Sequence, residues 1–346
     1  MERNRQINLA ARPVGEPKDS DFQLVETDIP EPGPGEMLLR TIYLSLDPYM
    51  RLRMNPVSHM PTFEIGKPLG GATVSVVEKS NLPDYAPGTL VASTNGWTVY
   101  ALSNGKNPFG RPLAKLEPGR APLTAPLSLM GMPGLTAYSG LLKIGQPKAG
   151  ETIVVSGAAG TVGAIVGQIA KLKGCTVIGI AGGPRKCGFV KELGFDAVVD
   201  YKAGNLAGDL RAACPKGVDI YFENVGGAVF DAVLPLLNLF ARIPVCGHVA
   251  EYNAVEHKVG PDKIPALMLA VLGKRLTIRG FVVSDFAADM PAFAQEMAGW
   301  LREGKVRYRD EITDGLDNAV RAFQRMLRAE NFGKSIIRVS PEPQRA

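Results

Sequence analysis

The sequence predicts an α/β chain in which a small antiparallel β-barrel is followed by a parallel, doubly wound sheet. Up to about residue 125 the apolar runs are short and are separated by turns rich in proline and glycine, which is typical of antiparallel β-structure. From residue 151 onward, strand-like runs alternate with helix-like segments, which indicates a parallel sheet. A glycine-rich turn joins the first of these strands to the first helix.

The first domain is expected at residues 1–125, completed by residues 307–346. Its strands are predicted at 22–25, 36–44, 72–77 and 89–92, with the densest turn at 30–35, and the returning strands at 306–312 and 333–339. The second domain is expected at 126–306, opening with a helical stretch at 127–142. Its six strands are predicted at 153–155, 175–180, 197–200, 217–223, 241–247 and 276–283, followed by a helix at about 290–303.

The turn at 157–163 has the pattern A-x-G-x-x-G, with Ala158, Gly160 and Gly163 in the named positions. Gly160 lets the backbone approach a pyrophosphate, and Gly163 lets the helix pack close to the sheet. The first N–H groups of that helix then point at the anion. Alone the motif is weak, because an ordinary tight turn can have the same residues. The second strand about twenty residues later completes a βαβ unit, which favours dinucleotide binding.

The end of the second strand indicates which dinucleotide is bound. An NAD-selective site places Asp or Glu there to bind the ribose 2′-hydroxyl, whereas this chain has Gly182 and Gly183 followed by Arg185 and Lys186. Small residues leave room for a 2′-phosphate and the two cations attract it. The pattern therefore favours NADP(H); a solvated basic turn before a helix is the alternative.

Composition excludes several other classes of function. The 346 residues include 39 Lys and Arg against 34 Asp and Glu, and these charges are dispersed, so we expect no nucleic-acid partner. No apolar stretch reaches ~18 residues, so no membrane span is expected. The N-terminus lacks the apolar core of a signal peptide, and we expect a cytoplasmic protein. The four cysteines and three histidines show no metal-ligand spacing, so any catalysis should be metal-free.

Motifs spread over the whole chain resemble one known family. They are residues 44–51, 131–138, 157–163, 222–227, 252–253 and 330–334. In these the chain resembles the zinc-independent branch of the medium-chain dehydrogenase/reductase superfamily that contains prostaglandin reductases, leukotriene B4 dehydrogenases, alkenal double-bond reductases and the bacterial curcumin reductases. The resemblance implies a GroES-like first domain, a Rossmann second domain and a homodimer, with the strand near 276–283 as its candidate interface.

The resemblance also implies cofactor contacts from matching positions. The pyrophosphate turn is Gly160, Thr161, Val162 and Gly163, and Gly182, Lys186 and Tyr201 match the adenosine 2′-phosphate and ribose side. The remaining matches are Met132, Thr136, Asn224, Cys246, Gly247, Tyr252, Phe281, Val282, Val283 and Asn331. Several have plainer alternatives: Asn224 is also suited to a simple turn, Met132 to the core, and residues 281–283 to core or an edge strand.

The activity that the resemblance implies is NADPH-dependent reduction of the C=C bond of α,β-unsaturated ketones and aldehydes. Hydride reaches the β-carbon, and hydroxyl donors rather than a metal stabilise the enolate. Tyr252 and Tyr49 are the candidate catalytic residues, and Tyr49, Arg51 and Tyr138 the candidate substrate contacts. Tyr252 as a loop anchor, Tyr49 as a packed aromatic and Arg51 as a surface charge are the alternatives. An NADPH quinone reductase and a non-catalytic NADPH-binding protein are the other functions considered.

Overall fold

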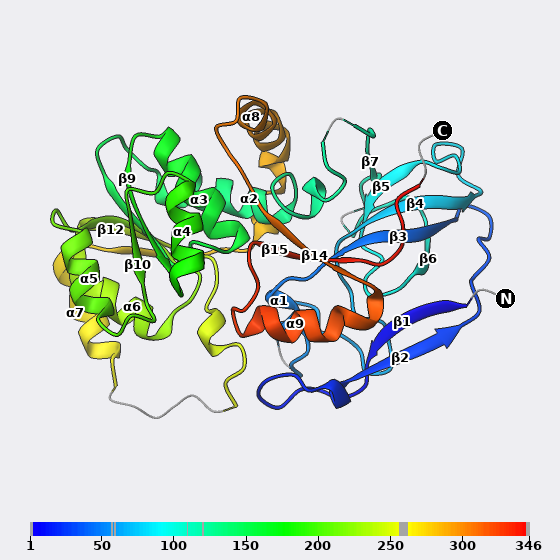
Figure 1. The fold of residues 1–346 in the computed structure, drawn as a ribbon, viewed down its shortest axis with the longest axis horizontal. Coiled ribbons are helices and arrows are strands. Elements are labelled where there is room, and N and C mark those ends of the chain that lie inside the picture. The colour runs from blue at the N-terminus through cyan, green and yellow to red at the C-terminus, as the bar shows by residue number, and fades with distance from the viewer. Residues whose placement is uncertain are drawn as a thin grey trace. The chain divides into compact units, whose positions relative to one another are not determined.

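The computed structural model describes residues 3–56, 58, 60–108, 110–119, 121–255 and 262–343. The chain divides into two compact units: residues 1–127 with 310–346 form unit 1, and residues 128–309 form unit 2 (Figure 1).

Unit 1 is built mainly from antiparallel strands. Strands β1 (Asn4–Leu9) and β2 (Phe22–Thr27) pair with each other, and the other strands form a sheet in the order β14-β15-β3-β4-β5-β7, with β6 also paired to β3. Only β14 and β15 in this sheet run parallel, and β15 pairs with β3, which explains why the C-terminal segment belongs to this unit. These strands are β3 (Met37–Ser45), β4 (Thr73–Ser80), β5 (Leu90–Ser93), β6 (Tyr100–Ser103), β7 (Ala114–Lys115), β14 (Asp310–Asp314) and β15 (Lys334–Arg338).

Helix α9 (Ala319–Leu327) packs on the hydrophobic core of unit 1. Its apolar residues Ala319, Ala322, Phe323 and Met326 recur at helical spacing and are buried, as expected of an amphipathic helix. The Phe323 ring meets Trp97 edge-on with ring centroids 5.7 Å apart, and Trp97 stacks on Phe22 of β2. The shorter helical segments of unit 1 are η1 (Asp19–Asp21), α1 (Tyr49–Arg53), η2 (Ala125–Leu127) and η7 (Leu316–Asn318).

Unit 2 contains a six-stranded parallel sheet in the order β10-β9-β8-β11-β12-β13. The order reverses between β8 and β11, and ligands bind at such switch points, beyond the carboxyl ends of the strands. The strands are β8 (Thr152–Val155), β9 (Thr176–Ala181), β10 (Ala197–Asp200), β11 (Val218–Phe222), β12 (Leu237–Val245) and β13 (Thr277–Gly280). The predicted α/β fold class, antiparallel strands followed by a doubly wound parallel sheet, is confirmed.

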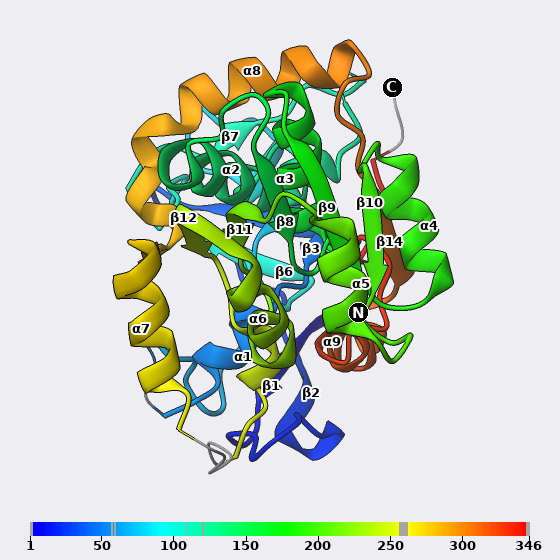
Figure 2. The same cartoon turned by 90° about the vertical axis from the view of Figure 1, so that its left-hand side faces the viewer.

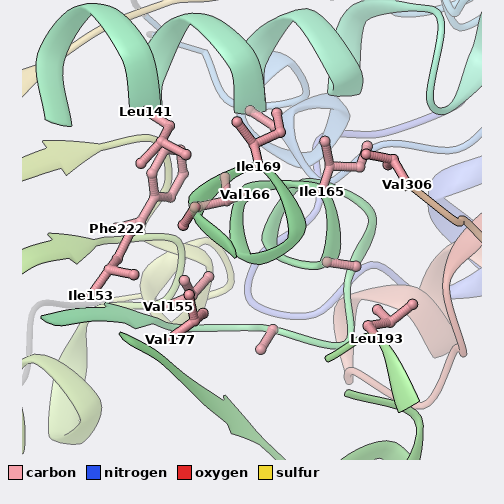
Figure 3. Close-up of a cluster of buried hydrophobic side chains, with 14 of the residues drawn as sticks. Leu141, Ile153, Val155, Ile165, Val166, Ile169, Val177, Leu193, Phe222 and Val306 are labelled. Carbon is pink, nitrogen blue, oxygen red and sulfur yellow. The ribbon is translucent and has the colours of Figure 1, made fainter. Parts of the chain in front are cut away.

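Helices cover both faces of this sheet (Figure 2). Neighbouring strand residues face opposite sides: Ile153 and Val155 pack with α2, α3 and α4, whereas Val154 packs with α5 and α6. Figure 3 shows the first of these interfaces, where Ile165, Val166 and Ile169 of α3 are fully buried against the strands. Burial of each of these side chains stabilises the folded state by about 1.5–3 kcal/mol. The helices are α2 (Met132–Ser139), α3 (Thr161–Leu172), α4 (Pro184–Glu192), α5 (Leu206–Ala213), α6 (Gly227–Val233), α7 (Ile264–Lys274) and α8 (Met290–Arg302).

Shorter helical segments join these elements. A π-helical segment, η3 (Gly140–Gly145), continues α2, and 3-10 turns are η4 (Leu234–Leu236), η5 (Val249–Glu251) and η6 (Val283–Asp289).

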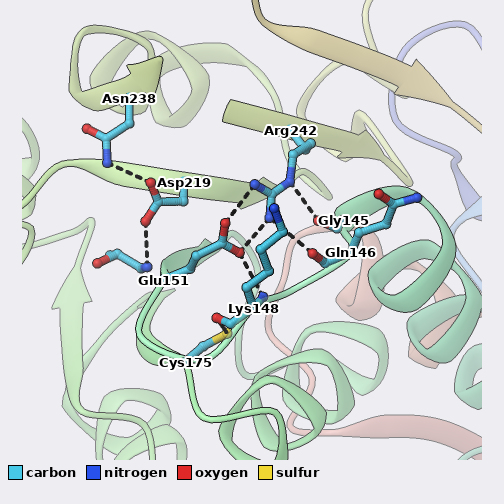
Figure 4. Close-up of polar contacts among 9 residues, drawn as sticks. Gly145, Gln146, Lys148, Glu151, Cys175, Asp219, Asn238 and Arg242 are labelled. Atoms are coloured by element: carbon cyan, nitrogen blue, oxygen red, sulfur yellow. Dashed lines mark hydrogen bonds and ion pairs between the residues drawn. The ribbon is translucent and has the colours of Figure 1, made fainter. Parts of the chain in front are cut away.

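A polar network holds the amino-terminal side of the sheet (Figure 4). Arg242 donates two hydrogen bonds to the Glu151 carboxylate, of 2.6 and 2.8 Å, and a third to the carbonyl of Gly145. Burial favours the neutral form of Glu151, but Arg242 and the Lys148 N–H together outweigh it and lower the pKa of that carboxyl. Asp219 accepts from the Thr152 N–H and the Asn238 amide, both at 2.8 Å. These bonds fix β8 and β11 relative to each other at the end opposite the candidate site.

Candidate functional site

The glycine-rich turn places bare backbone at the start of α3. Gly157 has φ +60°, and the Gly160 N–H donates to its carbonyl at 2.9 Å. A Cβ on Gly163 would lie 2.4 Å from the Gly157 oxygen and 2.9 Å from the Ala158 Cα, so only glycine fits there without movement. Thr161 and Val162 occupy the first helical positions after the cap Gly160. The first N–H groups of a helix have no partner within it, and this turn therefore suits an anion.

The second strand–helix turn brings Gly182 and Tyr201 into contact. A Cβ on Gly182 would lie 2.6 Å from the Tyr201 ring, so glycine makes room for that ring. Lys186 lies in the first turns of α4 and is half-buried. The Lys202 ammonium lies 5.8 Å from the Tyr201 ring centroid. Aromatic surface and positive charge are thus gathered at the ends of β9 and β10.

Asp200, at the end of β10, is a residue that sequence reasoning missed. Its Oδ1 accepts from the N–H groups of Gly183 and Lys202, at 2.8 and 2.9 Å. These two bonds lower the pKa of the Asp200 carboxyl. The carboxylate fixes the turn at Gly183, whose φ is +84°. The sequence signal for Asp200 is its position at the end of the third strand, directly before Tyr201 and Lys202.

The switch point between β8 and β11 brings Asn224 beside the glycine-rich turn. The Asn224 side chain donates to the Ser156 carbonyl at 2.7 Å, and its backbone N–H donates to the Ser156 hydroxyl at 2.8 Å. Ser156 directly precedes Gly157 in the chain. Asn224 is therefore held against the turn, rather than serving only its own loop.

The loop that follows β12 packs on the same edge. A Cβ on Gly247 would lie 3.1 Å from the Asn224 carbonyl oxygen and 3.3 Å from the Tyr252 hydroxyl, which places the three residues together. The Tyr252 hydroxyl accepts the His248 N–H at 3.4 Å, and burial raises the pKa of this phenol. Burial, together with the charge of Glu223, raises the pKa of the neighbouring Cys246 thiol to about 12.

Residues 281–283 follow the edge strand β13. The Phe281 ring packs edge-on against Phe222 and Phe286, and a Cβ on Gly140 would lie 2.5 Å from it. Val282 is 38% exposed, and Val283 is partly buried against the core. Phe281 thus links the segment after β13 to the helical segment that begins with α2.

Helix α2 carries Met132, Thr136 and Tyr138. Met132 and Thr136 are partly buried, and the Thr136 hydroxyl donates to the Met132 carbonyl at 2.8 Å. Tyr138 is buried among aromatic rings and donates its hydroxyl to Glu296 at 3.1 Å; burial and this carboxylate raise its pKa to about 12. The expected contact of Tyr138 with substrate stays a prediction.

Unit 1 holds Tyr49, Arg51 and Asn331. Tyr49 begins α1 and is partly buried, and burial and the charge of Asp47 raise its pKa. Arg51 is 2% exposed and donates to the Gly15 carbonyl and the Asn55 side chain. These bonds anchor the Arg51 side chain, and its expected contact with substrate stays a prediction. The Asn331 amide donates to the Gly333 carbonyl at 2.8 Å.

A buried ion pair ties the segments of Tyr49 and Asn331 together. Lys334 donates to the Asp47 carboxylate and to the Leu46 carbonyl, with both charged side chains almost fully buried. Asp47 also accepts the Ser45 hydroxyl. Both charged residues stand in motifs that carry the family resemblance, but the pairing joins positions 287 residues apart.

Over the residues that the structure describes, no group of three or more His, Cys, Asp or Glu side chains is arranged to hold a metal ion. Two of the three histidines, His59 and His257, lie outside those residues. In the same described part of the chain, no helix has the length and apolar character needed to cross a membrane.

Comparisons with known proteins place the chain in a family. Residues 5–110 match the family model for the N-terminal domain of oxidoreductase, and residues 161–299 match that for zinc-binding dehydrogenase. The chain is 52% identical to the NADPH-dependent curcumin reductase of Escherichia coli (strain K12) over 98% of both chains. It is 40% identical to mouse prostaglandin reductase 1 over 94% of this chain and 95% of that one.

A solved structure shows the same likeness. CurA from Vibrio vulnificus in complex with NADPH superposes with a TM-score of 0.94 at 48% identity, covering 98% of this chain and 100% of that one. The chain belongs to the medium-chain dehydrogenase/reductase superfamily, in the branch that includes the curcumin and prostaglandin reductases.

Proposed function

We propose that this protein binds NADPH and reduces the C=C bond of α,β-unsaturated ketones and aldehydes. One observation carries the proposal: the carboxyl ends of β8, β11 and β12 bring together a turn of bare backbone, the Asn224 amide and the Tyr252 hydroxyl. Relatives named for NADPH-dependent reduction of curcumin and for prostaglandin reduction support this choice.

The residues present fit the cofactor. Backbone atoms of Gly157 and Ala158 occupy the space that a Cβ on Gly163 would need, so the start of α3 lies close against the turn. The N–H groups at this helix start suit the pyrophosphate. Lys186, Gly182 and Tyr201 are proposed for the adenosine 2′-phosphate and ribose. Asn224, Cys246, Gly247 and residues 281–283 are proposed for the nicotinamide side, with Met132 and Thr136 from α2 and Asn331 from unit 1.

Bound NADPH supplies a hydride to the β-carbon of the substrate, which leaves negative charge on the carbonyl oxygen. Tyr252 is proposed to donate its phenolic proton to a hydrogen bond with that oxygen. Its hydroxyl accepts the His248 N–H, so the proton is available for substrate, and the raised pKa keeps it bound at neutral pH. The α-carbon then takes a proton from Tyr252 or from solvent.

Tyr49 is proposed to orient the substrate from unit 1. Its raised pKa keeps the phenol neutral, so it offers a ring face and a hydrogen-bond donor without charge. The α1 helix that carries Tyr49 is anchored by the Arg51 contacts described above. A Tyr49→Phe variant should raise the KM for the enone more than the KM for NADPH.

We also propose that the protein is a homodimer. β13 lies at the edge of the sheet and all four of its residues are exposed. Directly before it in the chain, α7 has no buried residue, and Met268, Leu269 and Leu272 are each more than half exposed. Contiguous apolar surface of this kind is typical of an interface. Sedimentation should give twice the monomer mass, and Leu269→Lys should shift the equilibrium toward monomer. The cytoplasmic location stays a prediction.

A substrate panel tests the proposed activity. The protein and NADPH are mixed with simple enones, alkenals, a 15-oxo lipid, curcumin and quinones, and loss of the nicotinamide absorbance is followed. We expect consumption with the unsaturated carbonyls and recovery of their saturated products. Consumption with quinones alone would indicate a quinone reductase, and tight NADPH binding without turnover would indicate a non-catalytic protein.

A further inference from the structure

Glu223 is a buried carboxylate at the point where the strand order of the sheet reverses. It directly follows β11 and is 1% exposed. Its Oε1 accepts from the Ser156 hydroxyl at 2.8 Å and from the N–H groups of Val225 and Gly226 at 2.6 and 3.0 Å. Its Oε2 accepts the Tyr221 hydroxyl at 2.8 Å. Neutral donors thus satisfy a charge that would otherwise be costly to bury.

One branch of this network leads to the glycine-rich turn. The Ser156 hydroxyl has a single proton, and the charged Glu223 oxygen at 2.8 Å is a stronger acceptor than the Phe222 carbonyl at 3.2 Å. With its proton directed to Glu223, the same hydroxyl accepts the Asn224 N–H. The Ser156 carbonyl can only accept, so it fixes the Asn224 side chain with its nitrogen toward the turn. The direction of the Asn224 oxygen is thereby set.

The second branch leads to the loop that carries Tyr252. The Glu223 carbonyl accepts the N–H groups of Cys246 and Gly247, at 2.9 and 3.2 Å. The carbonyls of Asn224 and Val225, whose turn the Glu223 side chain closes, accept from Val249 and Ala250 at 3.3 and 3.0 Å. The loop between β12 and Tyr252 therefore rests on the turn that Glu223 holds.

We propose that Glu223 is a positioning residue of the NADPH site, which holds Asn224 and the glycine-rich turn in one arrangement through Ser156. The proposal rests on the proposed function. It assigns Glu223 no contact with cofactor or substrate. Its effect reaches the cofactor through Asn224 and the turn before α3, so its removal should weaken NADPH binding rather than only lower stability.

Two matched variants separate positioning from stability. Ser156→Ala and Tyr221→Phe each remove one hydroxyl that donates to Glu223, and both residues are fully buried. Of these two hydroxyls, that of Ser156 also accepts the Asn224 N–H, whereas no such bond links Tyr221 to Asn224 in the described structure. We expect Ser156→Ala to raise the Kd for NADPH by about tenfold, the loss of roughly one hydrogen bond to a charged group. Tyr221→Phe should change that Kd less than about threefold, although both variants lower the melting temperature.

Substitutions of Glu223 itself test whether a conservative variant keeps the affinity for NADPH. A glutamine can keep its oxygen toward Ser156, Val225 and Gly226 and turn its amide toward the Tyr221 hydroxyl, which can accept. We expect Glu223→Ala to raise the KM for NADPH by about tenfold or more, and Glu223→Gln to restore it to within about threefold of the wild type. Loss of stability alone would lower kcat, through the fraction of active enzyme, and leave KM unchanged.

NADPH fluorescence titration of the purified protein is the decisive measurement. Equal weakening by Ser156→Ala and Tyr221→Phe, or a folded Glu223→Ala with wild-type affinity, would overturn the positioning role. If Glu223→Ala does not fold, the Ser156 and Tyr221 pair decides alone. Failure of the wild type to bind NADPH would instead overturn the proposed function, so the two failures are distinguishable.

Discussion

Replacing Gly163 with alanine tests the close approach of α3 to the glycine-rich turn. The added Cβ would lie 2.4 Å from the Gly157 oxygen, 2.9 Å from the Gly157 carbonyl carbon and 2.9 Å from the Ala158 Cα. All three are backbone atoms, so rotation of a side chain cannot relieve the contact. Ordinary contacts begin near 3.4 Å, so the start of α3 must move by about 1 Å from the turn.

Two opposing effects determine how much Gly163→Ala changes the free energy of unfolding. Overpacking of this kind costs about 1–3 kcal/mol, and a contact made only with backbone falls at the upper end. Because alanine has a higher helix propensity than glycine, the substitution also stabilises the helix by about 1 kcal/mol. We therefore expect Gly163→Ala to lower the free energy of unfolding by about 2 kcal/mol. A shift of about 1 Å also lengthens the bonds from the turn to a phosphate, which should weaken NADPH binding about ten- to hundredfold.

Gly299→Ala is the matched control, because it lies inside α8 and its new Cβ would meet nothing within 4 Å. It should stabilise the protein by about 1 kcal/mol and leave cofactor affinity unchanged. Denaturant unfolding measures the first quantity and NADPH fluorescence titration the second. Wild-type stability and affinity in Gly163→Ala would refute the close approach.

Four further substitutions, one of them a control, test other parts of the molecule. Lys186→Ala should weaken NADPH far more than NADH, because only NADPH carries the 2′-phosphate; equal losses in titrations of the two cofactors would remove that assignment. Tyr252→Phe should lower kcat more than NADPH affinity; unchanged turnover would exclude the phenol from the mechanism. Because burial raises the pKa of Tyr252, the wild-type rate should fall from phenol ionisation only at a higher pH than an ordinary tyrosine would give. Lys334→Met leaves the Asp47 charge buried and unpaired, so unfolding should become easier by about 3–5 kcal/mol, whereas Lys79→Met breaks only an exposed pair and should cost less than about 1 kcal/mol.

The parallel sheet could be predicted because its strands β8 to β11 are apolar runs bounded by turns. The strand expected at 197–200 is β10 with the same bounds, and the helix expected at 290–303 is α8. β12 was expected at 241–247, yet it begins at Leu237, and Phe240 within it has φ +61° and is exposed. A left-handed aromatic residue in a strand has no local sequence signal, because its surroundings determine it.

The glycine-rich turn was visible in the sequence because its geometry is local. The Glu223 network was not, since Ser156 and Glu223 are 67 residues apart and meet only when β8 and β11 pair. Arg51 and Tyr138 could be singled out from their motifs, but the hydrogen bonds that they make in the interior could not be read from the sequence. Sequence spacing indicates which residues lie near a site, but burial decides which of them can face a ligand.

Transfer of a labelled hydride tests the central claim most directly. The protein is mixed with a simple enone and NADPH that carries deuterium at the transferable position of the nicotinamide. We predict a saturated ketone with one deuterium at the β-carbon and an ordinary solvent proton at the α-carbon. An enone left intact, or reduced at the carbonyl carbon to the allylic alcohol, would contradict the account.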